Sequence, residues 1–263
     1  MKNSPTVKLY FVVLLSVLAL TACGWLLALD AQKEQRIAEQ TIDSLFDGEP
    51  VWLPSNNAVA QETQFLALLT EGDPAKAAII LVHGTGQGPD TPFVIAPLRE
   101  LFAELNYTTL SLQMPVLGDD IAAEDYASEF DRASDRLSAG VTYIRNSGAT
   151  RVYMVAHSLG SSMMMNWAAN GGATTVDALV ALGFGGVMVF DAQATVKKLK
   201  LPLLDVIGER DFDSIITNAP ARSKYVSATN VYSAQTVIIG ADHFYNGKEK
   251  ELVDTIDHWL KSL

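Results

Sequence analysis

The sequence predicts an α/β protein built on a doubly wound, mainly parallel sheet. Apolar, β-branched stretches alternate with segments whose apolar residues recur at helical spacing, a pattern typical of a parallel sheet covered by helices. A serine lies in a tight turn between one such strand and the following helix, and an aspartate and a histidine follow two later strands. We therefore expect the strand ends to bring these polar side chains together.

The amino terminus has the pattern of a secretory signal. Lys2 and Lys8 precede an apolar run over residues 9–20, and small residues surround Cys23. Leu20-Thr21-Ala22-Cys23 resembles the bacterial lipobox, in which the cysteine is lipidated and becomes the first residue of the mature protein. Because Cys23 is the only cysteine, the chain cannot form an internal disulfide or a thiol-based metal or redox site.

A second interpretation of the same segment stays open. Residues 9–29 remain apolar beyond Cys23 and reach the length of about 20 residues that a membrane-spanning helix needs. We favour a lipoprotein signal over residues 1–29, with an uncleaved anchor as the alternative. Either one leaves the following domain outside the cytoplasm and tethered to the membrane, and Gly24 after a lipidated cysteine is compatible with sorting to the outer membrane.

Residues 30–59 are predicted to be a tether, and residues 60–263 an α/β domain. The first part of the tether is charged and reads as helical or extended, whereas Pro50 and Pro54 indicate a loop in the second part. A chain of 263 residues with 49% hydrophobic content suits one such domain plus an amino-terminal addition.

Strands and helices then follow one another in the order that a doubly wound sheet requires. Strands are predicted over residues 65–69, 78–82, 108–112, 151–155, 176–182, 203–208 and 231–239. Helices are predicted near Pro97, over residues 126–144, after the serine turn, and near the carboxyl terminus. The interval between residues 182 and 203 has no room for a lid domain, so we expect an open site.

Ser158 is the candidate nucleophile. It lies in Ala156-His157-Ser158-Leu159-Gly160, between a predicted strand and a predicted helix. A serine among small residues on such a turn resembles the nucleophile elbow of the α/β-hydrolases, which exposes Oγ above the helix amino terminus. Ala156 stands where that motif usually has glycine, which is a departure from the pattern.

The other candidate groups follow in the chain order of this superfamily. Asp211 comes after the strand that begins at Leu203, and His243 after the strand that ends at Ile239. His243 would take the serine proton, and Asp211 would orient its imidazole. Asp213 and Asp205 stay open as alternative acids, although Asp205 lies within the strand.

His83-Gly84-Thr85-Gly86 follows another strand and resembles the oxyanion loop of the superfamily. The backbone N–H groups of Thr85 and Leu159 would hold the oxyanion, each contributing on the order of 3 kcal/mol. We expect His83 to brace this loop, and His157 to point away from the serine hydroxyl.

Composition and spacing also exclude several classes of partner. A formal net charge of -11 makes nucleic acid an unsuitable partner. No His/Cys/Asp cluster has metal-ligand spacing, and the glycines of residues 84–88 match neither a dinucleotide motif nor a P-loop. We therefore expect neither a metal nor a cofactor.

Longer motifs resemble one bacterial branch of the α/β-hydrolase superfamily, a branch of unknown function. The branch has counterparts of the HGTG loop, Pro89–Leu98, Thr109–Pro115, the serine turn and Gly240-Ala241-Asp242-His243. The resemblance implies a hydrolase fold over about residues 60–263 and hydrolase activity.

From the residues and the resemblance together we predict a serine hydrolase that forms an acyl-enzyme in the bacterial cell envelope. Its substrate would be a carboxylic ester, either a small molecule or an acylated envelope component, with thioesters and amides still open. The alternative is a catalytically inert envelope protein that uses the same scaffold for binding. The sequence does not indicate acyl-chain length or oligomeric state.

Overall fold

A single sheet of eight strands organises the part of the protein that the structure describes. The computed structural model describes residues 32–55, 63–73, 77–118, 121, 123–185 and 190–263 of the chain. The strands are β1 (Glu49–Pro54), β2 (Gln64–Thr70), β3 (Ala78–Val82), β4 (Thr108–Leu112), β5 (Val152–His157), β6 (Ala178–Leu182), β7 (Leu203–Arg210) and β8 (Ala234–Asp242). Their order is β1-β2-β4-β3-β5-β6-β7-β8. The β1–β2 and β2–β4 pairs are antiparallel and the others parallel, which confirms the predicted sheet.

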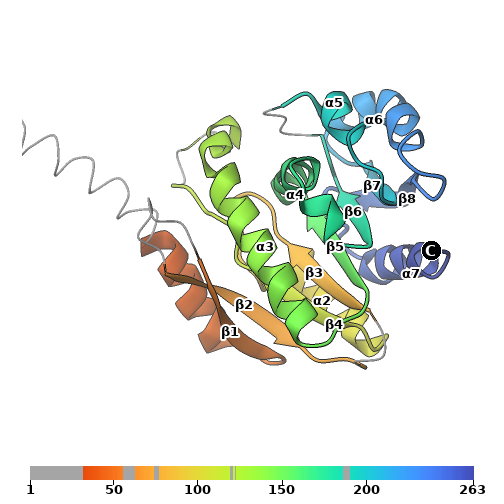
Figure 1. Cartoon of the computed structure of the whole chain (residues 1–263). Coiled ribbons are helices and arrows are strands. Elements are labelled where there is room, and N and C mark those ends of the chain that lie inside the picture. The colour runs from red at the N-terminus through yellow and green to blue at the C-terminus, as the bar shows by residue number, and fades with distance from the viewer. Residues whose placement is uncertain (1–31, 56–62, 74–76, 119–120, 122, 186–189) are drawn as a thin grey trace, which may run out of the picture.

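Helices cover both faces of the sheet (Figure 1). They are α2 (Ile95–Glu104), α3 (Phe130–Asn146), α4 (Leu159–Ala169), α5 (Ala192–Val196), α6 (Asp213–Val226) and α7 (Glu249–Leu260), with short 3₁₀ turns at Ala123–Glu129 and Gly172–Thr174. Buried side chains of α3 and α4 pack on one face, and those of α2 and α7 on the other. The link from β6 to β7 contains α5, which has five residues.

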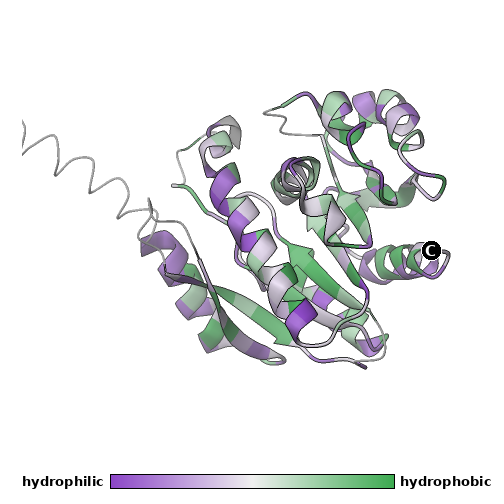
Figure 2. Ribbon diagram, viewed as in Figure 1, coloured by the Kyte–Doolittle hydropathy of each residue, from purple (hydrophilic) through white to green (hydrophobic). Residues whose placement is uncertain are grey.

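Burial on both faces explains the apolar strands. In β3, Ile80 and Val82 join the core beneath α3 and α4, while Ile79 and Leu81 join the core beneath α2 and α7. A strand enclosed in this way needs a continuous apolar run rather than an alternating one. Figure 2 shows the same contrast, with hydrophobic central strands and an α3 that carries hydrophilic residues.

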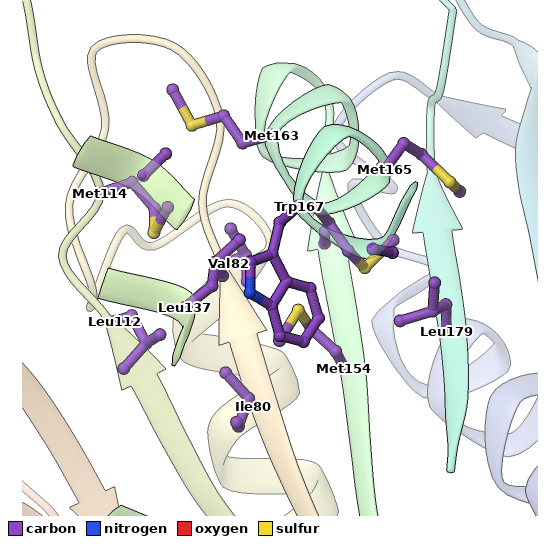
Figure 3. Close-up of a cluster of buried hydrophobic side chains, with 14 of the residues drawn as sticks. Ile80, Val82, Leu112, Met114, Leu137, Met154, Met163, Met165, Trp167 and Leu179 are labelled. Carbon is purple, nitrogen blue, oxygen red and sulfur yellow. The ribbon is translucent and has the colours of Figure 1, made fainter. Parts of the chain in front are cut away.

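The methionines of α4 belong to this core. Met163 is 2% exposed, and Met164 and Met165 are fully buried. Figure 3 shows Met163, Met165 and Trp167 packed with side chains from the strands below, Ile80 and Met154 among them. These methionines therefore fill the space between helix and sheet rather than lining a pocket.

The predicted tether differs from the structure over the residues described. Residues 32–44, called here the N-terminal helix, are helical, which is one of the two conformations predicted for this part. The segment with Pro50 and Pro54, in contrast, is the edge strand β1 rather than a loop. An edge strand tolerates proline because half of its N–H groups have no ladder partner. The helix packs Ala38 against Leu66 and Leu68 of β2.

A buried ion pair network fixes the amino-terminal end of this helix. Glu34 accepts hydrogen bonds from Arg132 at 2.6 Å and from Arg136 at 2.5 Å, both on α3. Glu34 also accepts from the Val116 amide at 2.9 Å and, through its carbonyl oxygen, from the Gln113 side chain at 2.9 Å. The N-terminal helix is thereby attached to the loop that follows β4.

One further prediction is corrected by the structure, and another concerns residues that the structure does not describe. The last strand begins at Ala234 rather than Val231, because Asn230 caps a turn by accepting from the Tyr232 and Ser233 amides. The signal or anchor expected over residues 1–29 lies outside the described residues. Within the described part of the chain, no helix combines the length and apolar character needed to cross a membrane.

The Glu34 network leads to a stability prediction. We expect Glu34→Ala to lower the free energy of unfolding by about 3–5 kcal/mol, because it removes the buried carboxylate that Arg132 and Arg136 share. Glu39→Ala, at an exposed position of the same helix, is the matched control and should change stability by about 0.5 kcal/mol or less. Urea denaturation of the purified proteins measures both changes in the free energy of unfolding. Equal changes in the two variants would contradict the stabilising role assigned to the Glu34 network.

Candidate active site

Ser158 stands on a strained turn between β5 and α4. Its backbone has φ 54° and ψ −123°, a conformation that non-glycine residues rarely adopt. The Ser158 amide donates to the Leu182 carbonyl of β6 at 2.8 Å. A Cβ on Gly160 would lie 2.4 Å from the His83 carbonyl oxygen, so only glycine permits this close approach of α4 to the end of β3. The hydroxyl remains partly accessible.

His243 joins Ser158 to Asp211. Its Nε2 lies 3.0 Å from the Ser158 Oγ, and its Nδ1 lies 2.6 Å from the Asp211 Oδ1. The Asp211 carboxylate also accepts from the Phe212 amide at 2.8 Å. Both His243 and Asp211 are buried, with 4% and 5% of their surface exposed. Three side chains from the ends of β5, β7 and β8 thus form one hydrogen-bonded chain.

The other two candidate acids lie elsewhere. Asp213 is exposed at the first position of α6. Asp205 lies within β7, where it is fully buried and accepts from Arg222 and Gln235 at 2.7 Å each. The geometry therefore selects Asp211 as the partner of His243.

His83 holds the loop that contains Thr85. The Met114 amide donates to the His83 Nε2 at 2.8 Å, so the ring proton is on Nδ1, which donates to the Gly84 carbonyl at 2.8 Å. Burial lowers the pKa of His83 to about 4, which keeps the ring neutral near pH 7. This imidazole connects the loop after β3 to the loop after β4.

The Gly84 loop passes next to the serine. A Cβ on Gly84 would lie 3.1 Å from the Ser158 Cβ, and Thr85 follows at an exposed position. Leu159 is the first residue of α4, so its amide has no acceptor within that helix. In the described part of the chain, neither the Thr85 nor the Leu159 amide donates to a protein acceptor.

The His157 side chain points toward the backbone of the loop that carries His243. Its Nε2 donates to the His243 carbonyl at 2.9 Å, as a neutral ring requires when the acceptor is a carbonyl. Burial lowers its pKa to about 4, and the neighbouring His243 adds to this effect. His157 therefore positions the loop that carries His243 and does not bond to the serine.

Three phenylalanines that lie near His243 were not predicted from the sequence as part of the site. The Phe212 ring stacks on the imidazole with centroids 4.2 Å apart, and the Phe244 ring meets it edge-on at 5.2 Å. Phe93, near the start of α2, contacts Phe244 at 5.6 Å. The sequence does contain one indication of these aromatic neighbours, because a phenylalanine directly follows both Asp211 and His243.

Across the residues that the structure describes, no group of three or more His, Cys, Asp or Glu side chains could hold a metal ion. The groups that the structure brings together at Ser158 are a hydroxyl, an imidazole and a carboxylate.

Comparison with known proteins supports the fold. A family model for a protein of unknown function, DUF3530, matches residues 31–129, and so includes the N-terminal helix and β1. No curated protein matches the chain. Among solved structures, Est1E from Butyrivibrio proteoclasticus is 18% identical with a TM-score of 0.61, covering 82% of this chain and 98% of its own.

Two further solved structures are similar. The dienelactone hydrolase from Anabaena variabilis is 16% identical with a TM-score of 0.66, covering 82% of this chain and 97% of its own. XC6422 from Xanthomonas campestris, described as a serine hydrolase without lid, is 14% identical with a TM-score of 0.60, covering 83% and 95%. The chain therefore has the α/β-hydrolase fold.

The buried histidines lead to a prediction about acid stability. An unfolded histidine binds a proton below about pH 6.5, whereas folded His157 does so only below about pH 4. The free energy of unfolding should therefore fall as the pH decreases through this window, by roughly 3 kcal/mol for His157 alone. In His157→Gln, which keeps a side-chain N–H donor, the loss between pH 7 and pH 4 should be smaller by that amount.

Urea denaturation at a series of pH values measures this difference. His258→Gln, at an exposed position of α7, is the control and should follow the wild-type curve. If the His157→Gln and wild-type curves run parallel between pH 7 and pH 4, burial does not hold His157 neutral.

Proposed function

We propose that the protein is a serine hydrolase that cleaves carboxylic esters through an acyl-enzyme. The observation that carries the proposal is the hydrogen-bonded chain from Asp211 through His243 to Ser158. The fold shared with esterases and other hydrolases is compatible with this chemistry but does not by itself determine it.

Each group has a defined step in the proposed reaction. His243 Nε2 removes the Ser158 proton as Oγ attacks the ester carbonyl, and the N–H groups of Thr85 and Leu159 bind the resulting oxyanion. The protonated imidazole, stabilised by Asp211, then gives its proton to the departing alcohol, which leaves an acyl-serine. Water attacks this ester in the same way, releasing the carboxylic acid and restoring the hydroxyl.

A different class of function has one observation in its favour. Ala156 stands where the serine turn usually has its first glycine, and a departure from the motif is compatible with an inert protein that keeps the scaffold for binding. The replacement is small, however, because Ala156 is fully buried in β5 and its side chain is absent from the bonded chain. We therefore place the esterase function first.

Fluorophosphonate labelling of the purified protein tests the nucleophile. We expect stoichiometric labelling of the wild type and none of Ser158→Ala, because the probe reacts only with an activated serine. Labelling that persists in Ser158→Ala would exclude Ser158. A folded wild type with neither labelling nor hydrolysis of short-chain esters would favour the inert binding protein.

A pair of aspartate variants tests the assignment of the acid. Asp211→Asn should lower kcat by about four orders of magnitude, because the imidazole tautomer is no longer fixed. Asp213→Asn, a matched change two positions away, should leave kcat within a few-fold of the wild type. Ester hydrolysis by proteins of equal thermal stability gives the comparison, and the reverse ranking would assign the acid to Asp213.

We also propose that this activity lies outside the cytoplasm, on a protein tethered to the membrane by lipid on Cys23. The basic, apolar and small-residue pattern of residues 2–23 supports the proposal. Two or more acyl chains would give stable attachment. An uncleaved anchor over residues 9–29 is the competing model.

Cys23→Ser discriminates between these two models. A lipoprotein should incorporate labelled palmitate, and the variant should lose this label and accumulate as the unprocessed precursor. An uncleaved anchor predicts no label in the wild type and an unchanged mass in the variant. Metabolic labelling combined with mass spectrometry of the membrane fraction distinguishes these outcomes.

A further inference from the structure

The phenylalanines around His243 form an apolar surface that the proposed reaction leaves unused. Phe212 and Phe93 are 54% and 51% exposed, and Phe244 is half-buried between Phe93 and the imidazole. Scattered exposed apolar residues are ordinary on protein surfaces. Here, however, two aromatic rings from separate loops contact one histidine, and a third ring from another loop contacts one of them.

We propose that this aromatic cluster (Phe93, Phe212 and Phe244) binds the alcohol part of the substrate and selects esters of aromatic alcohols. The inference rests on the proposed function and adds the substrate class to it. Its first support is position: the rings contact the imidazole itself, at 4.2 Å and 5.2 Å.

The direction of proton transfer determines which part of an ester lies there. His243 must protonate the departing oxygen, so that oxygen has to lie within hydrogen-bond reach of Nε2. The carbonyl oxygen points instead toward the Thr85 and Leu159 amides. A group attached to the departing oxygen therefore extends from the imidazole toward the aromatic cluster, while the acyl group extends elsewhere.

The chemistry of the rings indicates an aromatic partner. Two exposed phenylalanines offer ring faces and edges to a ligand, and aromatic pairs prefer the offset or edge-on contacts that this arrangement allows. Phe93 and Phe244 already show such a tilted contact, with 51° between their planes. Aromatic surfaces also bind quaternary ammonium groups, so an experiment must separate apolar from cationic alcohols.

Matched pairs of esters test the proposal on the full-length protein in detergent. Benzyl acetate and ethyl acetate share the acyl group and differ in the alcohol, whereas ethyl phenylacetate carries its ring on the acyl side. We expect kcat/KM for benzyl acetate to exceed that for ethyl acetate by about tenfold or more. We expect Phe93→Ala to bring this ratio close to one, and to leave the ratio of ethyl phenylacetate to ethyl acetate unchanged.

Ratios measured on one sample do not depend on the fraction of folded protein. Phe46→Ala is the matched control, because Phe46 is fully exposed and lies between the N-terminal helix and the edge strand β1. The control should keep the wild-type benzyl-to-ethyl ratio. Phe93 is preferred to Phe212 for the test because Phe93 contacts Phe244 and has no recorded ring contact with His243.

Three results with these esters would overturn the proposal while ester hydrolysis stands. They are equal kcat/KM for benzyl and ethyl acetate, a preference that survives Phe93→Ala, and a Phe93 effect confined to ethyl phenylacetate. A preference for acetylcholine over its uncharged analogue 3,3-dimethylbutyl acetate would also overturn it, by assigning the cluster to a cation. Absence of both fluorophosphonate labelling and turnover in folded wild type would reject the hydrolase function itself, and the inference with it.

Discussion

The strained backbone of Ser158 is the constraint on which the site depends. A φ of 54° in a non-glycine residue costs on the order of 1–3 kcal/mol and persists only where the surroundings enforce it. Here the Ser158 amide bonds to the end of β6, and Gly160 rests against the end of β3. The central strands thus hold the Ser158 hydroxyl at the carboxyl-terminal end of the sheet. The loops after β7 and β8 then bring the Asp211 carboxylate and the His243 imidazole to it.

Two buried, neutral histidines connect the loops around Ser158 by hydrogen bonds. His157 bonds to the backbone of the His243 loop, and His83 joins the Gly84 loop to the loop after β4. That second loop is in turn fixed by Glu34 and Arg136. A continuous path of hydrogen bonds therefore runs from the N-terminal helix to the loop beside Ser158, which gives the amino-terminal segment a part in shaping the site.

The sequence was informative where local chemistry decides the structure. Strands buried on both faces must be continuously apolar, and a tight strand-to-helix turn must have small residues, so the sheet and Ser158 were both predictable. Position alone favoured Asp211, which is the carboxylate that His243 contacts in the structure, whereas Asp205 accepts a hydrogen bond from Arg222.

Long-range contacts explain what the sequence could not reveal. Glu34 lies far along the chain from Arg132 and Arg136, so nothing local indicated that residues 32–44 belong to the fold. The segment of β1 was predicted to be a loop because it contains Pro50 and Pro54, which an edge strand tolerates. The aromatic cluster joins Phe93 to residues near the carboxyl terminus, and only the closure of the sheet brings them together.

Several local costs converge on the same few residues, and this bears on whether the scaffold is active or inert. Besides the strain at Ser158, the buried atoms Asp211 Oδ2 and His157 Nδ1 lack hydrogen-bond partners among the described residues. Each unpaired buried polar atom costs on the order of 1–3 kcal/mol. Departures from local rules are expected at functional sites, where an activity maintains them. The strain at Ser158 and the unpaired oxygen of Asp211 therefore fall within one hydrogen-bonded group, the same group on which the proposed esterase reaction rests.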